Sequence, residues 1–496
     1  MEERLFETAR ESSLDNRRRK RHLVTNAGCE TGFFVVATSQ AAFLSHNGFS
    51  MRLLHTADWH LGHHLHGHDR SYEQSCFLDW LTDLILARDI DGLLIAGDIF
   101  DTANPAAASW QLFYRFLARL RERVPHLNVI AIGGNHDSPS KLDAPHELLK
   151  AFELHLIGAI SRDTRGALEL ERLIVPLKDR SGAIQAWCAA VPYLRSADLR
   201  LEDGPTDGRN SDADSPDANR PDANSPDAHS TDANSHPEED RLIAGVRAIY
   251  RQVIAAIDAR RSPEQPIVAL GHAYLSRGEL SLLSERKVLG GNQHALPLDI
   301  FQGADYVALG HLHLAQALTP ATAIPLVHYS GSPIPLSLAE SHYNHQVLEL
   351  EVGPTGVVLA QRHPVPRVVP MLRLPPEPLS LAEVEAHLQA YPWTPCPPEQ
   401  RPFLEVRVKL EKPEPRLRER ILAALADQPV RLARITTHYA GQGEAMADRL
   451  ARQQLDELTP EQVFALCHQR VYATPPAAEL QSAFAELLNE YQESSS

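Results

Sequence analysis

Five short groups of metal-binding residue types occur along the chain, and each follows an apolar segment typical of a buried β-strand. The strand-like segments are MRLLHTA, GLLIAG, NVIAIGG, PIVALG and ADYVALG. The groups that follow them are, in order, Asp58-Trp59-His60, Gly97-Asp98-Ile99-Phe100-Asp101, Gly133-Gly134-Asn135-His136-Asp137, Gly271-His272 and Gly310-His311-Leu312-His313. Open α/β folds place their functional sites at the edge of the sheet where such strands end. The five groups together therefore predict one shared metal site.

The spacing and chemistry of these residues favour a site with two ions. Alternate residues of an extended chain point to the same side, so Asp58 with His60, and His311 with His313, can reach one cavity. The side chains offer carboxylate, imidazole and amide groups without a thiolate, which suits Mn²⁺, Fe²⁺ or Zn²⁺ better than a structural cysteine–zinc site. Seven ligands exceed the needs of one tetrahedral ion but suffice for two ions if one carboxylate bridges them. Two ions about 4 Å apart activate water and stabilise the attacking and leaving oxygens in phosphoryl transfer.

The order of the groups resembles the calcineurin-like metallophosphoesterase pattern, DxH … GDxxD … GNHD … H … GHxH. The segments LHTADWHLG, AGDIFDT, GGNHDS, ALGHLH and YSGSPIPLSLAE further resemble the SbcD family, the nuclease subunits of bacterial SbcCD complexes. The resemblance covers roughly residues 51–440 and extends more loosely into the C-terminal segment. The metal motifs identify only the superfamily, whereas DWHLG together with GSPIPLS indicates the SbcD branch.

The resemblance implies a role for each residue of the motifs. The ligands would be Asp58, His60, Asp98 and His313 for one ion, and Asp98, Asn135, His272 and His311 for the other, with Asp98 bridging. His136 would stabilise the charge on the scissile phosphate or protonate the leaving oxygen, as an imidazole can near neutral pH. Asp137 would orient the His136 ring through a hydrogen bond. Asp101 would support the ligands rather than bind an ion.

Two further segments are candidates for substrate contacts. The loop after the first motif carries four histidines and one arginine, namely His63, His64, His66, His68 and Arg70. These residues fit either an additional metal site, contacts to substrate phosphates or an ordinary polar loop. After His272, the side chains of Arg277, Arg286 and Lys287 could bind DNA phosphates, which positions nucleic acid without reading its sequence. A solvated loop is the alternative interpretation of that segment.

The acidic balance of the chain does not exclude DNA as a substrate. The net charge is −16, although phosphate backbones are bound by lysine and arginine. Residues 202–240 hold twelve acidic residues against two arginines and contribute −10 of this charge. This segment repeats Pro, Asp, Asn and Ser without aromatic residues, so we expect it to be a disordered insert. Two bound divalent ions would also add positive charge to the cleft.

The predicted fold is α/β: a calcineurin-like β-sandwich flanked by helices, with a small C-terminal α/β capping domain and a helical tail. We expect residues 1–50 to be an extension outside the fold, disordered or derived from an upstream start codon, and residues 51–365 to form the nuclease domain. The alternating strand FLEVRVKL, a helix with Leu417, Ile421, Leu422 and Leu425, and the strand VRLARITT place an α/β domain at 366–440. A capping box at Thr459 and an apolar stripe after Thr474 predict two tail helices within 441–496.

The resemblance implies a two-metal DNA nuclease with partners. The expected activities are ATP-dependent double-strand exonuclease and single-strand endonuclease on DNA ends and hairpins, with two divalent ions, Mn²⁺ first and Fe²⁺ or Mg²⁺ as alternatives. The tail would bind the SbcC ATPase in a heterotetramer of two SbcC and two SbcD chains that contains an SbcD homodimer. Five scattered cysteines and the lack of a 20-residue apolar run favour a cytoplasmic protein without a membrane span. A small-molecule phosphodiesterase or phosphatase, and a non-catalytic scaffold on the same fold, are the alternatives.

Overall fold

The structure is a computed structural model that describes residues 51–199, 237–276, 278 and 295–439, with isolated positions 464, 468–469, 476, 480–481 and 484 of the C-terminal segment. All of the described residues belong to one structural unit, residues 48–496. Expectations for residues 1–50, for most of the acidic segment 202–240, and for Arg277, Arg286 and Lys287 lie outside the described residues. Most of the tail at 441–496 lies outside them as well.

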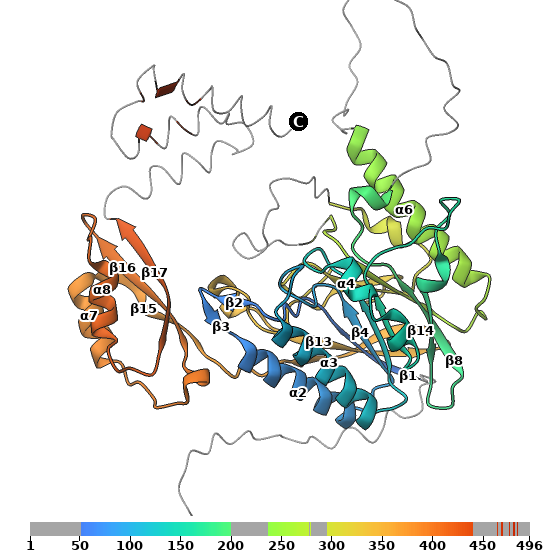
Figure 1. The fold of residues 1–496 in the computed structure, drawn as a ribbon, viewed down its shortest axis with the longest axis horizontal. Coiled ribbons are helices and arrows are strands. Elements are labelled where there is room, and N and C mark those ends of the chain that lie inside the picture. Colours follow the sequence, from blue (N-terminus) through green and yellow to red (C-terminus); the bar gives the residue numbers. More distant parts are fainter. Residues whose placement is uncertain are drawn as a thin grey trace, which may run out of the picture. The chain divides into compact units, whose positions relative to one another are not determined.

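Two six-stranded mixed sheets form the centre of the structure (Figure 1). The first sheet has the order β14-β13-β1-β4-β5-β6, with the bounds Met51–Thr56 (β1), Gly92–Ala96 (β4), Asn128–Ile132 (β5), Leu154–Ile157 (β6), Gln346–Gly353 (β13) and Gly356–Pro364 (β14). The second has the order β11-β12-β10-β9-β8-β7, with the bounds Ile174–Lys178 (β7), Ile184–Ala190 (β8), Ile267–His272 (β9), Tyr306–Gly310 (β10), Gln316–Ala317 (β11) and Leu326–Tyr329 (β12). Strands β1, β4, β5 and β6 run parallel, as do β8, β9, β10 and β12. The expected α/β sandwich is confirmed.

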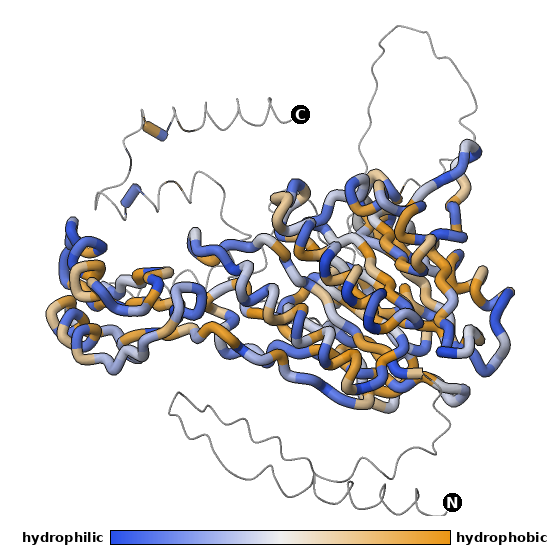
Figure 2. The backbone as a smooth tube through the Cα atoms, turned by 60° about the horizontal axis from the view of Figure 1, so that its bottom comes forward, coloured by the Kyte–Doolittle hydropathy of each residue, from blue (hydrophilic) through white to orange (hydrophobic). Residues whose placement is uncertain are grey.

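Strands β4 and β5 of the first sheet are buried on both faces, which explains why they are apolar without alternation. In β4, Leu94 packs into the core between the two sheets, whereas Leu93 and Ile95 belong to a second core beneath two helices. These helices are α2 (Ser71–Ala87) and α3 (Ala107–Arg123). They contribute Phe77, Phe113 and other apolar side chains to that core. Figure 2 shows hydrophobic and hydrophilic residues alternating along the helices, as expected for elements with one buried face.

A third long helix, α6 (Pro237–Asp258), packs against the second sheet through Val246, Val253 and Ile257. The helix begins at Pro237. The predicted disordered insert at 202–240 was therefore wrong for residues 237–240, which are helical. Proline is compatible with the first turn of a helix. The other elements are β2 (His64–Leu65), β3 (His68–Asp69), α4 (Pro139–Asp143), α5 (His146–Lys150) and 3₁₀ turns at Leu170–Arg172, Ser196–Leu199, Leu298–Phe301, Leu338–His342 and Pro398–Gln400.

The C-terminal domain contains a parallel three-stranded sheet, β15-β16-β17, with the bounds Met371–Ser380, Phe403–Leu410 and Arg431–Tyr439. Its helices are α7 (Leu381–Ala390) and α8 (Leu417–Ala424). The alternation predicted for 403–410 is confirmed, because Leu404, Val406, Val408 and Leu410 are all buried. The predicted helical stripe was wrong at Leu422, which is 46% exposed while Ile421 is fully buried.

Within the described part of the chain, no helix is both long enough and apolar enough to cross a lipid bilayer.

Candidate metal centre

The predicted ligands meet at the carboxyl ends of five strands. The groups at 58–60, 98–101 and 135–137 follow β1, β4 and β5 of the first sheet, while His272 ends β9 and His311 and His313 follow β10 of the second. The predicted strand before each group is therefore confirmed. The site lies where the two sheets of the sandwich converge at their C-terminal edges, and each sheet contributes part of the donor set.

The backbone at the ligand positions is unusual. Asp58, His60, Asp98 and His311 all have positive φ angles, of 54°, 45°, 48° and 102°. Such angles are uncommon for residues other than glycine and cluster at functional sites, where the surrounding structure holds them in place. The first two loops are hydrogen-bonded to each other, from Asp58 N to Gly97 O and from His60 N to Asp98 O, each at 3.0 Å.

Two glycines of the motifs allow these loops to approach closely. A Cβ atom on Gly134 would lie 2.1 Å from Oδ1 of Asp98, and one on Gly97 would lie 2.2 Å from Nδ1 of His272. Gly97 also has a φ of 91°, which a residue with a side chain rarely adopts. Glycine is therefore required at both positions, because a larger residue would collide with a side chain of the site.

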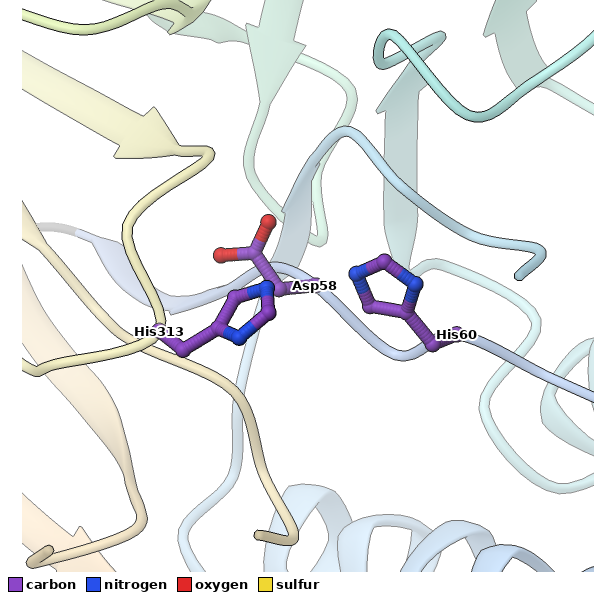
Figure 3. A group of neighbouring side chains, drawn as sticks. All are labelled: Asp58, His60 and His313. Carbon is purple, nitrogen blue, oxygen red and sulfur yellow. The ribbon is translucent and has the colours of Figure 1, made fainter. Parts of the chain in front are cut away.

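One half of the site consists of Asp58, His60 and His313, whose side chains converge from the segments after β1 and β10 (Figure 3). A donor atom from each lies within 4.8 Å of the others. The rings of His60 and His313 have centroids 5.2 Å apart in an edge-to-face arrangement. All three side chains are buried.

The other half contains His272, His311 and Asn135. Oδ1 of Asn135 lies 2.9 Å from Nε2 of His272 and 3.1 Å from Nδ1 of His311. The two imidazole centroids are 5.3 Å apart. Nδ1 of His272 donates to the carbonyl oxygen of Ala96 at 2.9 Å, which leaves Nε2 as the nitrogen that faces the site.

Asp98 lies between the two halves. Its Oδ2 atom is 3.6 Å from Nε2 of His60 and 3.3 Å from Nε2 of His272. Its Oδ1 atom accepts a hydrogen bond from the backbone N–H of His136 at 2.8 Å. One carboxylate oxygen is thus directed to a histidine of each half, which is the arrangement that a bridging ligand requires.

The chemistry of these residues fits divalent cations. Among the described residues, Oδ2 of Asp58 and Nε2 of His60 are buried polar atoms without a hydrogen-bond partner. Burying such atoms unpaired is costly, and metal ions are among the partners that compensate for it. Both residues belong to the donor group of Asp58, His60 and His313. The site thus supplies oxygen and nitrogen donors in the combination that Mn²⁺ and Fe²⁺ accept.

The protonation states point the same way. Burial lowers the pKa of His60 to about 4 and that of His311 to about 3, so both rings are neutral, as metal ligands must be. Burial raises the pKa of Asp58 to about 7. Burial opposes the charged form of His272 too, but the adjacent Asp98 carboxylate outweighs it and raises the pKa of His272 to about 9. The metal-free site therefore retains protons that bound cations would displace.

Two carboxylates hold the ligand rings from outside. Oδ1 of Asp101 lies 3.2 Å from Nδ1 of His60, as expected for a supporting residue. Oε1 of Glu340 lies 3.2 Å from Nδ1 of His313. Each contact directs the other ring nitrogen inward and increases its basicity. Glu340 was not predicted as a site residue from the sequence, although it belongs to the segment YSGSPIPLSLAE. An acidic residue at the end of an otherwise uncharged motif was the available signal.

The predicted role of Asp137 was wrong. Its carboxylate accepts hydrogen bonds from the backbone N–H groups of Ile99, Phe100 and Gly134 at 2.9–3.1 Å, because it closes the loop after β5 onto the loop after β4. The His136 ring is oriented instead by a backbone carbonyl, that of Asp101, which lies 2.8 Å from Nδ1. A carbonyl can only accept, so Nδ1 carries the hydrogen and Nε2 is the nitrogen available to a substrate.

The prediction of Arg70 as a DNA contact was also wrong. Its side chain is fully buried and forms a two-point ion pair with Glu73 at 2.6 and 2.7 Å. It also donates to the carbonyl of Pro335 and lies over the Phe403 ring of the C-terminal domain, which Arg431 contacts as well. Arg70 therefore connects parts of the fold rather than contacting solvent.

The histidines after the first motif have separate surroundings. His63 lies 3.1 Å from Asp101 and 2.9 Å from the carbonyl of Leu336, and His68 contacts the carbonyl of Leu432 in the C-terminal domain. His64 contacts the nearby Gly62 carbonyl. Among the described residues, the candidate metal-binding groups draw on the main site and not on three residues of this loop. Of the alternatives for this loop, the structure favours polar and supporting contacts.

Comparison with known proteins agrees with this geometry. Residues 51–315 match the family model of the calcineurin-like phosphoesterases, and residues 367–472 match a model described as the type 5 capsule protein repressor C-terminal domain. The SbcD chain of the SbcCD nuclease from Rhodobacter capsulatus is 35% identical over 418 residues, which cover 84% of this chain and 94% of that protein. Its counterpart from Escherichia coli K12 is 27% identical, with 84% and 92% covered, and that from Bacillus subtilis is 31% identical, with 61% and 67% covered. The chain therefore belongs to the calcineurin-like phosphoesterases and, among them, to the SbcD family of SbcCD nuclease subunits.

Proposed function

We propose that this chain hydrolyses DNA phosphodiester bonds at a two-metal centre, as the SbcD component of an SbcCD-type nuclease. The family makes it a metal-dependent phosphodiester hydrolase. The observation that carries the two-metal assignment is the position of Asp98, whose Oδ2 atom faces His60 on one side and His272 on the other. The ligand division is then the one expected from the sequence, with Asp58, His60 and His313 in one half and Asn135, His272 and His311 in the other.

Two divalent ions held there would supply Lewis acidity and a water-derived nucleophile at neutral pH. We propose Mn²⁺ as the preferred ion, because the donor set mixes carboxylate, amide and imidazole without a thiolate. Fe²⁺ accepts the same donors. Mg²⁺ prefers an all-oxygen shell, and four of the seven proposed ligands are imidazoles, so we expect Mg²⁺ to support less activity.

The residues of the chain contribute positioning and proton transfer. His60 and His313 are held by Asp101 and Glu340, so their inward nitrogens need no reorganisation when the substrate binds. His136 presents Nε2 next to the His60 ring, at a centroid distance of 4.8 Å. We propose that His136 acts in its imidazolium form, with a hydrogen on both ring nitrogens, and donates a hydrogen bond or its Nε2 proton to the leaving oxygen of the scissile phosphate group, which leaves the neutral Nδ1–H ring. Asp137 maintains the loop that carries both Asn135 and His136.

The proposed partner is an SbcC-type ATPase bound by the C-terminal tail, in a 2:2 heterotetramer that includes an SbcD homodimer and acts on DNA ends. Within the described positions of the tail, the rings of Phe464 and Phe484 stack at 4.2 Å, which supports a helical hairpin. Leu480, on the predicted apolar stripe, is 44% exposed and available to a partner. We further propose a cytoplasmic location, since the relatives are subunits of bacterial nucleases and Cys76, Cys188 and Cys396 are free thiols.

A nuclease assay tests the proposal. Blunt duplex and single-stranded DNA are incubated with the protein and Mn²⁺ or Mg²⁺, with and without SbcC and ATP. We expect single-strand endonuclease activity with Mn²⁺ and duplex exonuclease activity that requires SbcC and ATP. Hydrolysis of cyclic nucleotides without cleavage of DNA would indicate a small-molecule phosphodiesterase instead. DNA and SbcC binding without hydrolysis under any of these conditions would indicate a scaffold.

A truncation tests the partner separately. Removal of residues 441–496 should abolish co-purification with SbcC and leave the Mn²⁺-dependent cleavage of single strands. Retention of SbcC by the truncated chain would contradict the proposed role of the tail.

A further inference from the structure

A cavity opens directly beside the second half of the metal centre. Its volume is about 70 Å³, enough for several water molecules or for the edge of a planar ring that stacks at its rim. The metal-ligand candidates His272 and His311 form part of its wall. The remaining wall includes side chains from the segment after β8, from α6 and from the turn at 298–301, among them Tyr193, Leu194, Leu242, Val246, Ile300 and Phe301.

The interior of this cavity is apolar and its rim is aromatic. Val246, Ile300 and Phe301 are almost completely buried and form the floor. The hydroxyl of Tyr250, which also lines the cavity, is already bonded to the carbonyl of Leu270 at 3.0 Å. Tyr193 and Tyr274 are partly exposed at the rim. Such a cavity suits a flat, weakly polar group rather than a charged one.

A fixed cation lies next to the aromatic rim. The guanidinium of Arg195 lies 5.4 Å from the centroid of the Tyr193 ring and donates to the backbone carbonyl of Asp137 at 3.2 Å. The Tyr193 ring in turn meets the His272 ring edge-to-face at 6.1 Å. Metal ligand, aromatic ring and cation thus follow one another within one short stretch of the surface.

On the basis of the proposed function, we propose that this cavity receives one unstacked base of the DNA, from a nucleotide next to the scissile phosphate. Tyr193 provides the stacking surface, the floor at Val246 and Ile300 accepts the edge of the ring, and Arg195 contacts the neighbouring phosphate. The adjacency of the cavity to His272 and His311 carries the assignment, because a phosphate at the metal centre places its flanking nucleotides at this wall.

The proposal explains two properties that such a nuclease would need. Stacking on an aromatic ring is tolerant of sequence, since every base has a π face, so the enzyme would cleave without base preference. A base enters the cavity only after it leaves the stack, which costs a few kcal/mol in a duplex and less in a single strand. Single strands, hairpin loops and frayed ends would therefore be cleaved more readily than internal duplex positions.

The test combines a protein change with a substrate change. Leu242→Trp fills the cavity from α6 without altering a proposed ligand, and Ala244→Trp adds the same side chain at an exposed position of that helix. Each protein cleaves a single-stranded oligonucleotide with Mn²⁺, and the same oligonucleotide with one abasic residue within two nucleotides of the mapped cleavage bond. Calorimetric Mn²⁺ titration confirms that both variants retain the metal centre.

We expect Leu242→Trp to lower kcat/KM on the intact strand roughly 5- to 100-fold, the range of one lost stacking contact. The abasic residue should cost the wild type a similar factor and Leu242→Trp little further. Ala244→Trp should behave as the wild type. The inference would be overturned if the abasic residue slowed the wild type and Leu242→Trp equally, or if neither change had an effect. Cleavage of DNA by the wild type in the same assay would still uphold the proposed function.

A second measurement addresses the cation. Arg195→Gln should weaken the binding of single-stranded DNA and reduce the slope of log K against log salt by about 0.7, the value for one phosphate contact. An unchanged slope would remove Arg195 from the proposed subsite.

Discussion

Oε1 of Glu340 lies 3.2 Å from Nδ1 of His313, so a fully buried carboxylate holds the ring of this proposed metal ligand. The second oxygen of Glu340 accepts the backbone N–H of Leu336 at 2.8 Å, which fixes the carboxylate itself. Asp101 has the same relation to His60. The two histidines of the first half are therefore oriented by side-chain charges, whereas His272 in the second half relies on a backbone carbonyl.

Glu340→Gln should weaken Mn²⁺ binding or activity roughly 10- to 100-fold, the usual effect of removing such a supporting carboxylate. The amide retains the shape of the side chain but removes the charge that makes Nε2 of His313 more basic. Mn²⁺ titration calorimetry measures the loss. Glu351→Gln is the matched control, because Glu351 pairs with Arg52 at the opposite end of β1. Equal affinities for Glu340→Gln and the wild type would contradict the assigned role.

Asp98→Ala should abolish hydrolysis, with a loss of at least about 1,000-fold, since both halves of the site share this carboxylate. The calorimetric titration should also show fewer than two bound ions per chain. Asp83→Ala, on the exposed face of α2, is the control and should be fully active. A variant at Asp98 that still binds two ions and cleaves DNA would refute the bridging assignment.

His136→Asn should reduce kcat roughly 100- to 10,000-fold, the range for loss of a positioned general acid. Metal affinity should be unchanged, because the ring is bound to the carbonyl of Asp101 and stands outside the proposed ligand set. Cleavage kinetics and Mn²⁺ titration of the same preparation separate the two effects. A parallel loss of metal would place His136 among the ligands instead.

Mn²⁺ binding should release protons in a number that depends on pH. The pKa values of Asp58 and His272 are raised to about 7 and about 9, so each group holds a proton below its own value in the metal-free protein. Cations compete with these protons, and affinity therefore rises with pH. We expect release of about two protons at pH 6 and about one at pH 8. Calorimetry in buffers of different ionisation enthalpy counts them, and binding that is independent of pH would contradict the assignment.

Arg70→Met should destabilise the protein by about 3–5 kcal/mol, because it leaves the Glu73 carboxylate buried without its partner. The double variant Arg70→Met/Glu73→Met should recover much of this loss, since no isolated charge remains. Chemical denaturation measures both free energies of unfolding. If Arg70→Met were as stable as the wild type and only bound DNA more weakly, the ion pair would not stabilise the fold and Arg70 would be a DNA contact after all.

Much of the candidate metal centre could be placed from the sequence because its signals are local. Each proposed ligand follows or ends a strand that is recognisable from its own composition, and parallel strands within one sheet bring their carboxyl ends to the same edge. The alternation at 403–410 was equally local. The strand at 403–410 needed only the periodicity of a single element, whereas the division of the ligands between two ions came from the family resemblance.

The errors concern contacts between distant segments. Arg70 and Glu73 form a recognisable pair in sequence, but their burial depends on Pro335 and Phe403, more than 260 residues away. The family resemblance implied that Asp137 orients the His136 ring, whereas the carboxylate of Asp137 accepts hydrogen bonds from backbone N–H groups of another loop. Glu340 lies in a 3₁₀ turn next to His313, and no pattern of apolar residues in the sequence predicts this turn.

The left-handed backbone at Asp58, His60, Asp98 and His311 has a consequence for protein engineering. The seven side chains alone would not reproduce this centre on another scaffold, because regular strand ends do not offer these φ angles. A transplant would have to carry the whole pair of loops, with Gly97, Gly134 and the carboxylate of Asp137 that ties the loops together. The smallest unit that could be transferred is therefore a set of backbone turns supported by two sheets. The ligand side chains can be added only once these turns are in place.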